Sequence, residues 1–178
     1  MTMFDYWSWE EKIPLDQIKK INERISRLES DGEDQPAEDT TKTAGVKILN
    51  YCDLQDYINP YLNYILSVNE FNFGYNLYRV TYSKCNYNVY EKDGEYDWHV
   101  DESLNAFHDI KLTALINLSE DNYKGGDFQL MKGHVINVAF KKPGDMLVFK
   151  SHINHKVTPV TKGVRKTLTL FLKGPRFQ

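Results

Sequence analysis

The chain has 178 residues, with 22 Lys and Arg against 25 Asp and Glu, so its formal net charge is −3 at pH 7. This acidic balance disfavours general nucleic-acid binding, because a nucleic-acid-binding protein needs a basic face. Hydrophobic residues make up 41% of the chain and aromatic residues 13%, which excludes wholesale disorder and favours β structure. The length predicts a single domain over residues 1–178.

The sequence carries no evident targeting or membrane segment. Crossing a membrane would take an apolar run of roughly 20 residues, and the first ten residues lack the basic and apolar regions of a signal peptide. Cys52 and Cys85 are the two cysteines, too few for a disulfide framework. We therefore expect a cytoplasmic protein without a membrane partner.

Two amphipathic helices are predicted within residues 1–70, which we expect to form a helical support region. Residues 14–28 repeat Ile and Leu at helical spacing, and Pro14 suits the first turn of a helix. Residues 53–68 carry a broad apolar face at the same spacing. The polar and acidic stretch between them, residues 30–44, predicts an exposed loop.

From residue 71 onward, short β-prone runs alternate with turn residues such as Asp93-Gly94 and Gly125-Gly126. The runs are residues 75–83, 86–91, 112–118, 128–131, 135–140, 146–149 and 164–172. Two helices followed by many strands predict a mainly β fold, with a sandwich or barrel over residues 71–178 and helices on one of its faces.

Two histidines and one aspartate form a candidate metal site. In His99-x-Asp101, a strand would point both side chains to the same face. His155, on a distant strand, would complete a set of two imidazoles and one carboxylate, which is typical of non-haem Fe(II) oxygenases. Taken singly, the pair is also compatible with a surface His near an Asp, and His155 with an ordinary loop residue.

Arg165 follows His155 by ten residues and opens the strongest strand signal in the chain. Alternation places one set of side chains on a polar face: Arg165, Thr167, Thr169 and Phe171. The other face is mostly apolar and is expected to pack on the helices: Lys166, Leu168, Leu170 and Leu172. A guanidinium that points into a barrel needs an anionic partner, and a carboxylate ligand matches its fork geometry.

Three longer motifs surround these residues in a set order. They are Tyr90-x3-Gly94-x-Tyr96-x2-His99-x-Asp101, then Gly125-Gly126-Asp127-Phe128-x-Leu130, then Pro143-Gly144-Asp145-Met146-Leu147-Val148-Phe149-x-Ser151 with His155-x-Val157-x-Pro159-Val160-x2-Gly163-x-Arg165. Over roughly residues 78–174, this order resembles the 2-oxoglutarate/Fe(II)-dependent dioxygenases, in the prolyl 4-hydroxylase-like branch and its PKHD-type hydroxylases in particular. His152, three residues before His155, lacks the downstream spacing of the motif.

The resemblance implies a double-stranded β-helix, the jelly roll or cupin-like fold, backed by N-terminal helices. It implies Fe(II) on His99, Asp101 and His155, and 2-oxoglutarate with its far carboxylate on Arg165. Tyr90 matches a tyrosine that helps to hold this cosubstrate. Weaker candidates for the same pocket are Thr113 and Thr167.

The implied reaction couples decarboxylation of 2-oxoglutarate by O2, which yields succinate and CO2, to hydroxylation of an unactivated C–H bond, with ascorbate as an additional reductant. A carboxylate at Asp101 argues for hydroxylation, because family members with Ala or Gly there tend to halogenate.

We expect a prolyl residue of a peptide or protein as the substrate. Residues 31–44 and 82–97 are the expected lids, with aromatic walls in the second. Lysyl or other protein residues and free amino acids stay open as substrates. More distant readings are a nucleic-acid demethylase, which the acidic balance disfavours, a non-catalytic jelly-roll binding module, and a zinc hydrolase, which would not need Arg165 or Tyr90.

Overall fold

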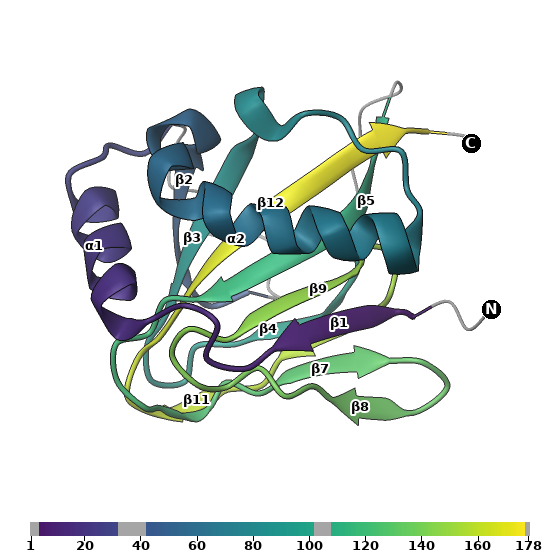
Figure 1. Cartoon of the computed structure of the whole chain (residues 1–178). Helices are drawn as coiled ribbons and strands as arrows, with labels where there is room; N and C mark the ends of the chain where they lie inside the picture. Colours follow the sequence, from purple (N-terminus) through teal and green to yellow (C-terminus); the bar gives the residue numbers. More distant parts are fainter. Residues whose placement is uncertain (1–3, 32–41, 102–107, 177–178) are drawn as a thin grey trace.

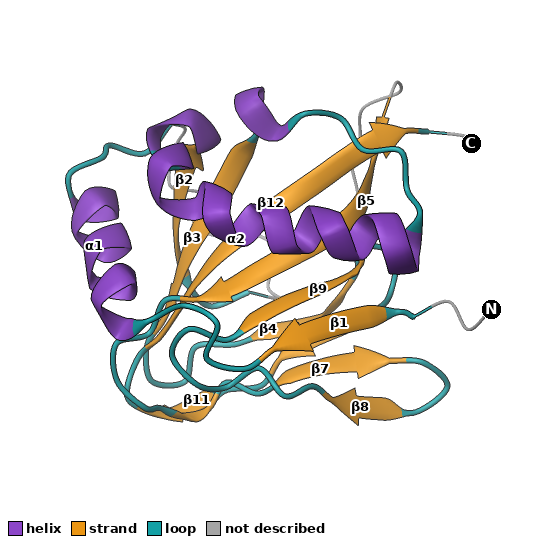
Figure 2. Ribbon diagram, in the orientation of Figure 1, coloured by secondary structure: helices purple, strands orange, loops and turns teal. Residues whose placement is uncertain are grey.

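The computed structural model describes residues 4–31, 42–101 and 108–176. Two β-sheets lie face to face, with two helices over the outer face of the larger one (Figures 1 and 2). The six-stranded sheet has the order β1 (Tyr6–Trp9), β9 (Met146–Lys150), β5 (His108–Asn117), β12 (Arg165–Pro175), β3 (Lys84–Tyr90) and β2 (Gly45–Asn50). The four-stranded sheet has the order β4 (Tyr96–His99), β10 (His155–Val157), β7 (Phe128–Met131) and β8 (Val135–Asn137). A short ribbon pairs β11 (Val160–Lys162) with β6 (Lys124–Gly125).

The chain alternates between the two sheets as it proceeds. From β3 it passes to β4 in the smaller sheet, back to β5, across to β7 and β8, back to β9, across to β10 and finally back to β12. Every pairing between these strands is antiparallel. This connectivity is a double-stranded β-helix, so the expected fold is confirmed.

Two helices cover the larger sheet because each carries one apolar stripe. Helix α1 (Leu15–Ser26) and helix α2 (Gln55–Val68) bury a row of side chains each: Ile18, Ile21 and Ile25, and Ile58, Leu62 and Ile65. They form one core with the outward residues of β12, namely Leu168, Leu170 and Leu172. The helix ends agree with prediction to within two residues at each end. Within the described residues, no helix is long and apolar enough to span a membrane.

Strand β9 separates this outer core from a second one between the sheets. Met146 and Val148 belong to the helix-covered core, and Leu147 and Phe149 belong to the inner core. Every residue of β9 is buried. A strand that is covered on both faces reads as a continuous apolar run, which explains why the sequence predicts it well.

The first 70 residues are not purely helical, contrary to expectation. They also supply β1 and β2, the two edge strands of the larger sheet. Each pairs with a single neighbour, β9 or β3, so the partner strand dictates the pairing and the local sequence gives little signal.

The strand predicted over residues 75–83 is also wrong. This segment has a single 3-10 turn (Val80–Tyr82) and no strand. Asn69 begins the π-helical turn that follows α2 (Asn69–Phe73). Its side chain accepts a hydrogen bond from the backbone N–H of Tyr75 at 3.0 Å and donates one to the Tyr75 carbonyl at 2.8 Å. These bonds replace a strand ladder at the start of the segment.

Candidate functional site

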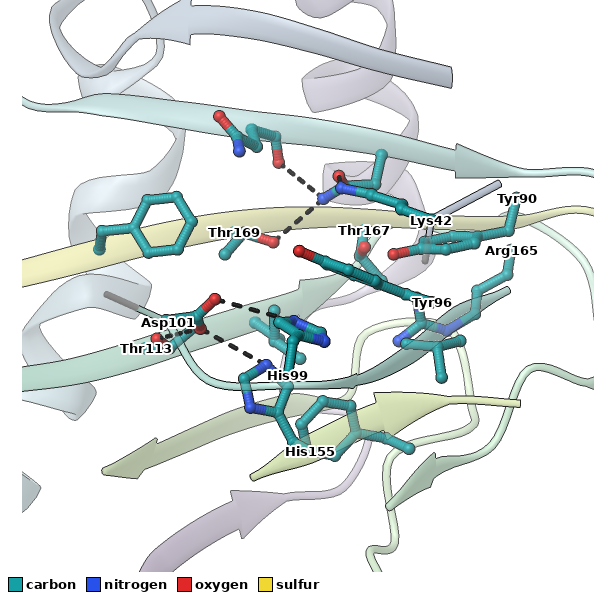
Figure 3. A pocket seen from close by; sticks show the side chains of 16 residues that line it. Lys42, Tyr90, Tyr96, His99, Asp101, Thr113, His155, Arg165, Thr167 and Thr169 are labelled. Atoms are coloured by element: carbon teal, nitrogen blue, oxygen red, sulfur yellow. Dashed lines mark hydrogen bonds and ion pairs between the residues drawn. The ribbon is translucent and has the colours of Figure 1, made fainter. Parts of the chain in front are cut away.

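The predicted metal site forms where β4 meets β10. His99 is the last residue of β4, His155 is the first residue of β10, and the two face each other in the antiparallel register. Asp101 follows β4 by two residues and joins them. One ligand atom from each residue lies within 4.8 Å of the other two. Figure 3 shows the three side chains directed towards one another.

Hydrogen bonds orient all three side chains. Nδ1 of His99 lies 2.7 Å from the carbonyl of Asp97, and Nδ1 of His155 lies 2.9 Å from the carbonyl of Ile153. A carbonyl oxygen can only accept, so each Nδ1 carries the proton and each Nε2 keeps its lone pair for a metal. The Nε2 atoms lie 3.8 Å and 3.5 Å from the Asp101 carboxylate.

The Asp101 carboxylate has its own hydrogen-bond partner. Thr113 on β5 donates from Oγ1 to Oδ2 of Asp101 at 2.6 Å. The other carboxylate oxygen stays directed at His99. Partners of this kind orient metal ligands and tune their basicity.

Burial controls the charge of the three groups. It lowers the pKa of His155 to about 4, and with the nearby charge of His155 it lowers the pKa of His99 to about 4. Burial also raises the pKa of Asp101, against the hydrogen bond from Thr113. Both imidazoles are therefore neutral at pH 7, as metal ligation requires. Two neutral imidazoles and one carboxylate on one side of a site match the facial set of non-haem Fe(II) oxygenases.

A cavity of about 90 Å³ runs from these residues between the two sheets. Its walls come from three neighbouring strands of the larger sheet, with aromatic residues of the smaller sheet opposite. The side chains from the larger sheet are Asn86, Asn88 and Tyr90 of β3, Thr113 and Leu115 of β5, and Arg165, Thr167, Thr169 and Phe171 of β12. The predicted alternation along β12 is thus confirmed.

Arg165 is the buried cation of this cavity, with 1% of its surface exposed. Its guanidinium lies 5.0 Å from the centroid of the Tyr90 ring and 5.6 Å from that of Phe140. Its Nε and Nη2 atoms have no acceptor among the residues that the structure describes. Buried N–H groups without a partner are costly, so they mark the place where an anionic ligand would bind.

The Gly125-Gly126 motif makes room for this arginine. Gly126 has φ +64°, and a Cβ there would lie 3.0 Å from Cδ of Arg165 and 3.0 Å from a methyl group of Val160. Glycine adopts this conformation without strain and leaves the space free. The motif therefore contributes to the cavity through backbone shape.

Thr113 and Thr167, both predicted for the cosubstrate pocket, line the cavity. The Thr113 hydroxyl, however, already donates to Asp101. His152, which lacks the motif spacing, is exposed. The structure thus brings all seven predicted residues into one place.

The expectation of a lid over residues 82–97 is wrong. Most of this stretch is built into the two sheets as β3 and β4, so it is framework. Two of its tyrosines, Tyr90 and Tyr96, do line the cavity, and Tyr96 stacks on His99 with ring centroids 3.4 Å apart. The other expected lid, residues 31–44, lies mostly outside the described residues.

Lys42 and Asn88 are among the cavity residues that the sequence does not single out. Lys42 bridges to Tyr96 through an isolated β-bridge, and its Nζ donates to Oδ1 of Asn88 at 2.7 Å. Burial lowers the pKa of Lys42 to about 8, with the charge of Asp101 opposing and that of Arg165 adding to the shift. Alternation along β3 could have indicated Asn88, two residues from Tyr90. Lys42 gives no such signal, because it lies within the polar stretch of residues 30–44.

Comparison with known proteins agrees with this geometry. The sequence profile of the 2OG-Fe(II) oxygenase superfamily matches residues 85–173, half of the chain. A PKHD-type hydroxylase of Synechococcus sp. (strain CC9605) is 36% identical over 73 residues, which are 39% of this chain and 32% of that protein. The chain thus matches about a third of the length of this curated relative.

Solved structures share the fold. A prolyl-4-hydroxylase of Pseudomonas putida superposes with a TM-score of 0.72 at 18% identity, covering 94% of this chain and 91% of that one. A prolyl hydroxylase of Trichoplax adhaerens, in complex with a hypoxia inducible factor peptide fragment, superposes with a TM-score of 0.67 at 18% identity, covering 94% and 83%. On the profile match, the chain belongs to the 2OG-Fe(II) oxygenase superfamily, whose members use Fe(II) and 2-oxoglutarate.

Proposed function

We propose that this protein is a 2-oxoglutarate- and Fe(II)-dependent dioxygenase that hydroxylates a prolyl residue of a peptide or protein, with succinate and CO2 as coproducts. One observation carries the reaction class. A buried arginine with unpaired N–H groups shares a single cavity with two neutral imidazoles and a carboxylate. A zinc hydrolase or a binding module would have no need of that arginine.

His99, Asp101 and His155 are the proposed iron ligands. Their protonation and hydrogen bonds leave two Nε2 lone pairs and one carboxylate oxygen for the metal. Because all three lie on one side of the metal position, coordination sites stay open for other ligands. When bound, iron with 2-oxoglutarate supplies the O2-dependent oxidation of a C–H bond.

Arg165 is the proposed anchor for the far carboxylate of 2-oxoglutarate. Its fork of N–H donors suits a carboxylate, and its burial excludes water from that contact. Tyr90 supports the guanidinium with its ring. Thr167, two residues along the same face of β12, is a further proposed contact.

The prolyl substrate is supported by the relatives. The fold matches two prolyl hydroxylases, one of them in complex with a peptide.

The reaction class is tested by anaerobic titration of the protein with Fe(II) and then 2-oxoglutarate. A keto acid chelated to Fe(II) is expected to give a weak charge-transfer band in the visible range. We expect the band in the wild type and in His152→Ala, an exposed histidine outside the motif. We expect its loss in His99→Ala and in Arg165→Leu. A wild-type protein that binds zinc and gives no band with Fe(II) would contradict the proposal.

The substrate is tested separately, by mass spectrometry of peptides incubated with the Fe(II)-loaded protein, 2-oxoglutarate, O2 and ascorbate. Proline-containing peptides should gain the mass of one oxygen atom on proline. Matched peptides with alanine in place of proline should not. Oxidation of the alanine peptides, or of lysine in both sets, would overturn the prolyl assignment and leave the reaction class intact.

A further inference from the structure

We propose that Lys42 is a second cationic anchor for 2-oxoglutarate, which binds the carboxylate at the metal end while Arg165 binds the far one. This inference rests on the proposed function. Lys42 lies outside the part of the chain that matches the superfamily profile, which begins at residue 85. It is therefore a feature of this chain that the match does not cover.

The backbone holds Lys42 against the strand that carries the first proposed iron ligand. Lys42 pairs with Tyr96 in an isolated bridge. The next residue, Thr43, exchanges two backbone hydrogen bonds with Glu95, at 2.8 Å and 3.2 Å. These contacts join the segment to the start of β4, so the backbone fixes the point from which the Lys42 side chain enters the cavity lining.

The side chain of Lys42 reaches across to the larger sheet. Its Nζ lies 2.7 Å from Oδ1 of Asn88, whose Nδ2 donates to Oγ1 of Thr169 at 3.1 Å. Asn88 is buried and already held by Thr169, so it presents its oxygen to the ammonium without further ordering. Figure 3 shows Lys42 in the same cavity as Arg165 and the three proposed iron ligands.

The ring of Tyr96 links the ammonium to the metal end. Nζ of Lys42 lies 4.9 Å from the centroid of the Tyr96 ring, and that ring stacks on His99 at 3.4 Å. The charges of both Asp101 and Arg165 act on the Lys42 ammonium, so it lies within reach of both ends of the cavity. Lys42, Tyr96 and His99 thus form a continuous row that leads to the proposed iron ligands.

The cavity lining carries one more cation than it has carboxylates. Its lining residues that are charged at pH 7 are Lys42, Arg165 and Asp101, and Asp101 is assigned to the metal. Lys42 and Arg165 therefore remain, in addition to the positive charge of Fe(II) itself, to attract the dianion 2-oxoglutarate. An ammonium has three N–H donors. Within the described residues, the Lys42 ammonium donates a hydrogen bond to one side chain, that of Asn88. A carboxylate at this place would satisfy donors that are otherwise unused.

The test measures binding of 2-oxoglutarate without turnover. The dissociation constant is obtained from the anaerobic charge-transfer band of the Fe(II) protein, and independently from the thermal shift of the metal-free protein with 2-oxoglutarate. We expect Lys42→Gln to weaken binding by roughly 10- to 100-fold, as for a lost hydrogen bond to a charged group. Lys42→Arg should retain most of the affinity, and Fe(II) affinity should not fall in either variant.

Lys156→Gln is the matched control. Lys156 also lies over an aromatic ring, 5.2 Å from the centroid of Trp98, but it does not line the cavity. Its variant should bind 2-oxoglutarate as the wild type does. Equal affinity in Lys42→Gln and the wild type would overturn the inference. A wild type that does not bind 2-oxoglutarate would instead overturn the proposed function.

A keto acid of the same length with a methyl group in place of the far carboxylate identifies the contact. Lys42→Gln should weaken the binding of this analogue as much as it weakens that of 2-oxoglutarate. Arg165→Leu should weaken the binding of 2-oxoglutarate and leave the binding of the analogue unchanged. If the effect of Lys42→Gln vanishes with the analogue, Lys42 binds the far carboxylate and the assignment to the metal end is wrong.

Discussion

The two faces of strand β12 show how one strand serves both folding and chemistry. The face towards the helices consists of Leu168, Leu170 and Leu172, all buried in one apolar core. The face towards the smaller sheet carries Arg165 and two threonines around a polar cavity. Successive side chains point to opposite faces, so the strand itself separates the cavity from the helix-covered core. Substitutions on the two faces should therefore have opposite consequences for stability and for ligand binding.

The largest expected effect is on ligand binding, from Arg165→Leu. Loss of a buried partner for a carboxylate should weaken the binding of 2-oxoglutarate by roughly 100- to 1,000-fold. The metal-free protein should keep or gain stability, because the variant removes a buried charge whose Nε and Nη2 have no acceptor within the described residues. Urea unfolding and the anaerobic titration measure the two quantities.

Arg27→Leu, at an exposed position after α1, is the control for Arg165→Leu. It should leave both quantities unchanged. A large loss of stability in Arg165→Leu, with 2-oxoglutarate affinity preserved, would mean that Arg165 stabilises the fold and does not bind the ligand.

The opposite result is expected on the other face, from Leu170→Ala. Leu170 is 3% exposed within the helix-covered core. Removing its side chain should lower the free energy of unfolding by about 2–5 kcal/mol. The fraction that stays folded should bind 2-oxoglutarate with wild-type affinity. A parallel loss of affinity would mean that the two faces of β12 are coupled through the strand.

A smaller effect should appear in the pH dependence of the metal-free protein. In the unfolded chain His99 and His155 protonate near pH 6.5, but in the folded protein their pKa values are about 4. Between these values the unfolded state binds more protons, so the free energy of unfolding should fall as the pH is lowered from about 6.5 to about 4. The raised pKa of Asp101 acts in the opposite direction and reduces the slope.

Urea unfolding at a series of pH values checks this slope. A variant with His99→Gln and His155→Gln should have a flatter profile over the same range. An identical profile in the variant would place the proton uptake elsewhere.

Residues on the site face were predictable from the sequence where a motif recorded their geometry. His99 and Asp101 are two residues apart, and alternation along β12 orients Arg165 and Thr167 alike. His155 could be chosen over His152 from its spacing to Arg165. The sheet pairing then brings these separate segments together, as the register between His99 and His155 shows.

The parts that could not be predicted depend on partners far away in the chain. Strands β1 and β2 exist because β9 and β3 offer a free edge. Lys42 enters the cavity because its backbone pairs with Tyr96, more than 50 residues later. Neither placement leaves a local pattern of polar and apolar residues, so a reading of the sequence in windows misses both.

The smallest expected effect distinguishes two roles for Thr113, which the sequence suggests for the cosubstrate and the structure joins to Asp101. Thr113→Val keeps the shape of the side chain and removes the donor. If Thr113 orients the metal ligand, Fe(II) affinity should fall by roughly 10- to 100-fold, and Thr113→Ser should restore it. The affinity of the Fe(II)-saturated protein for 2-oxoglutarate should then stay near the wild-type value. The reverse pattern, with Fe(II) affinity unchanged and 2-oxoglutarate weakened, would mean that the hydroxyl leaves Asp101 for the cosubstrate once the site is filled.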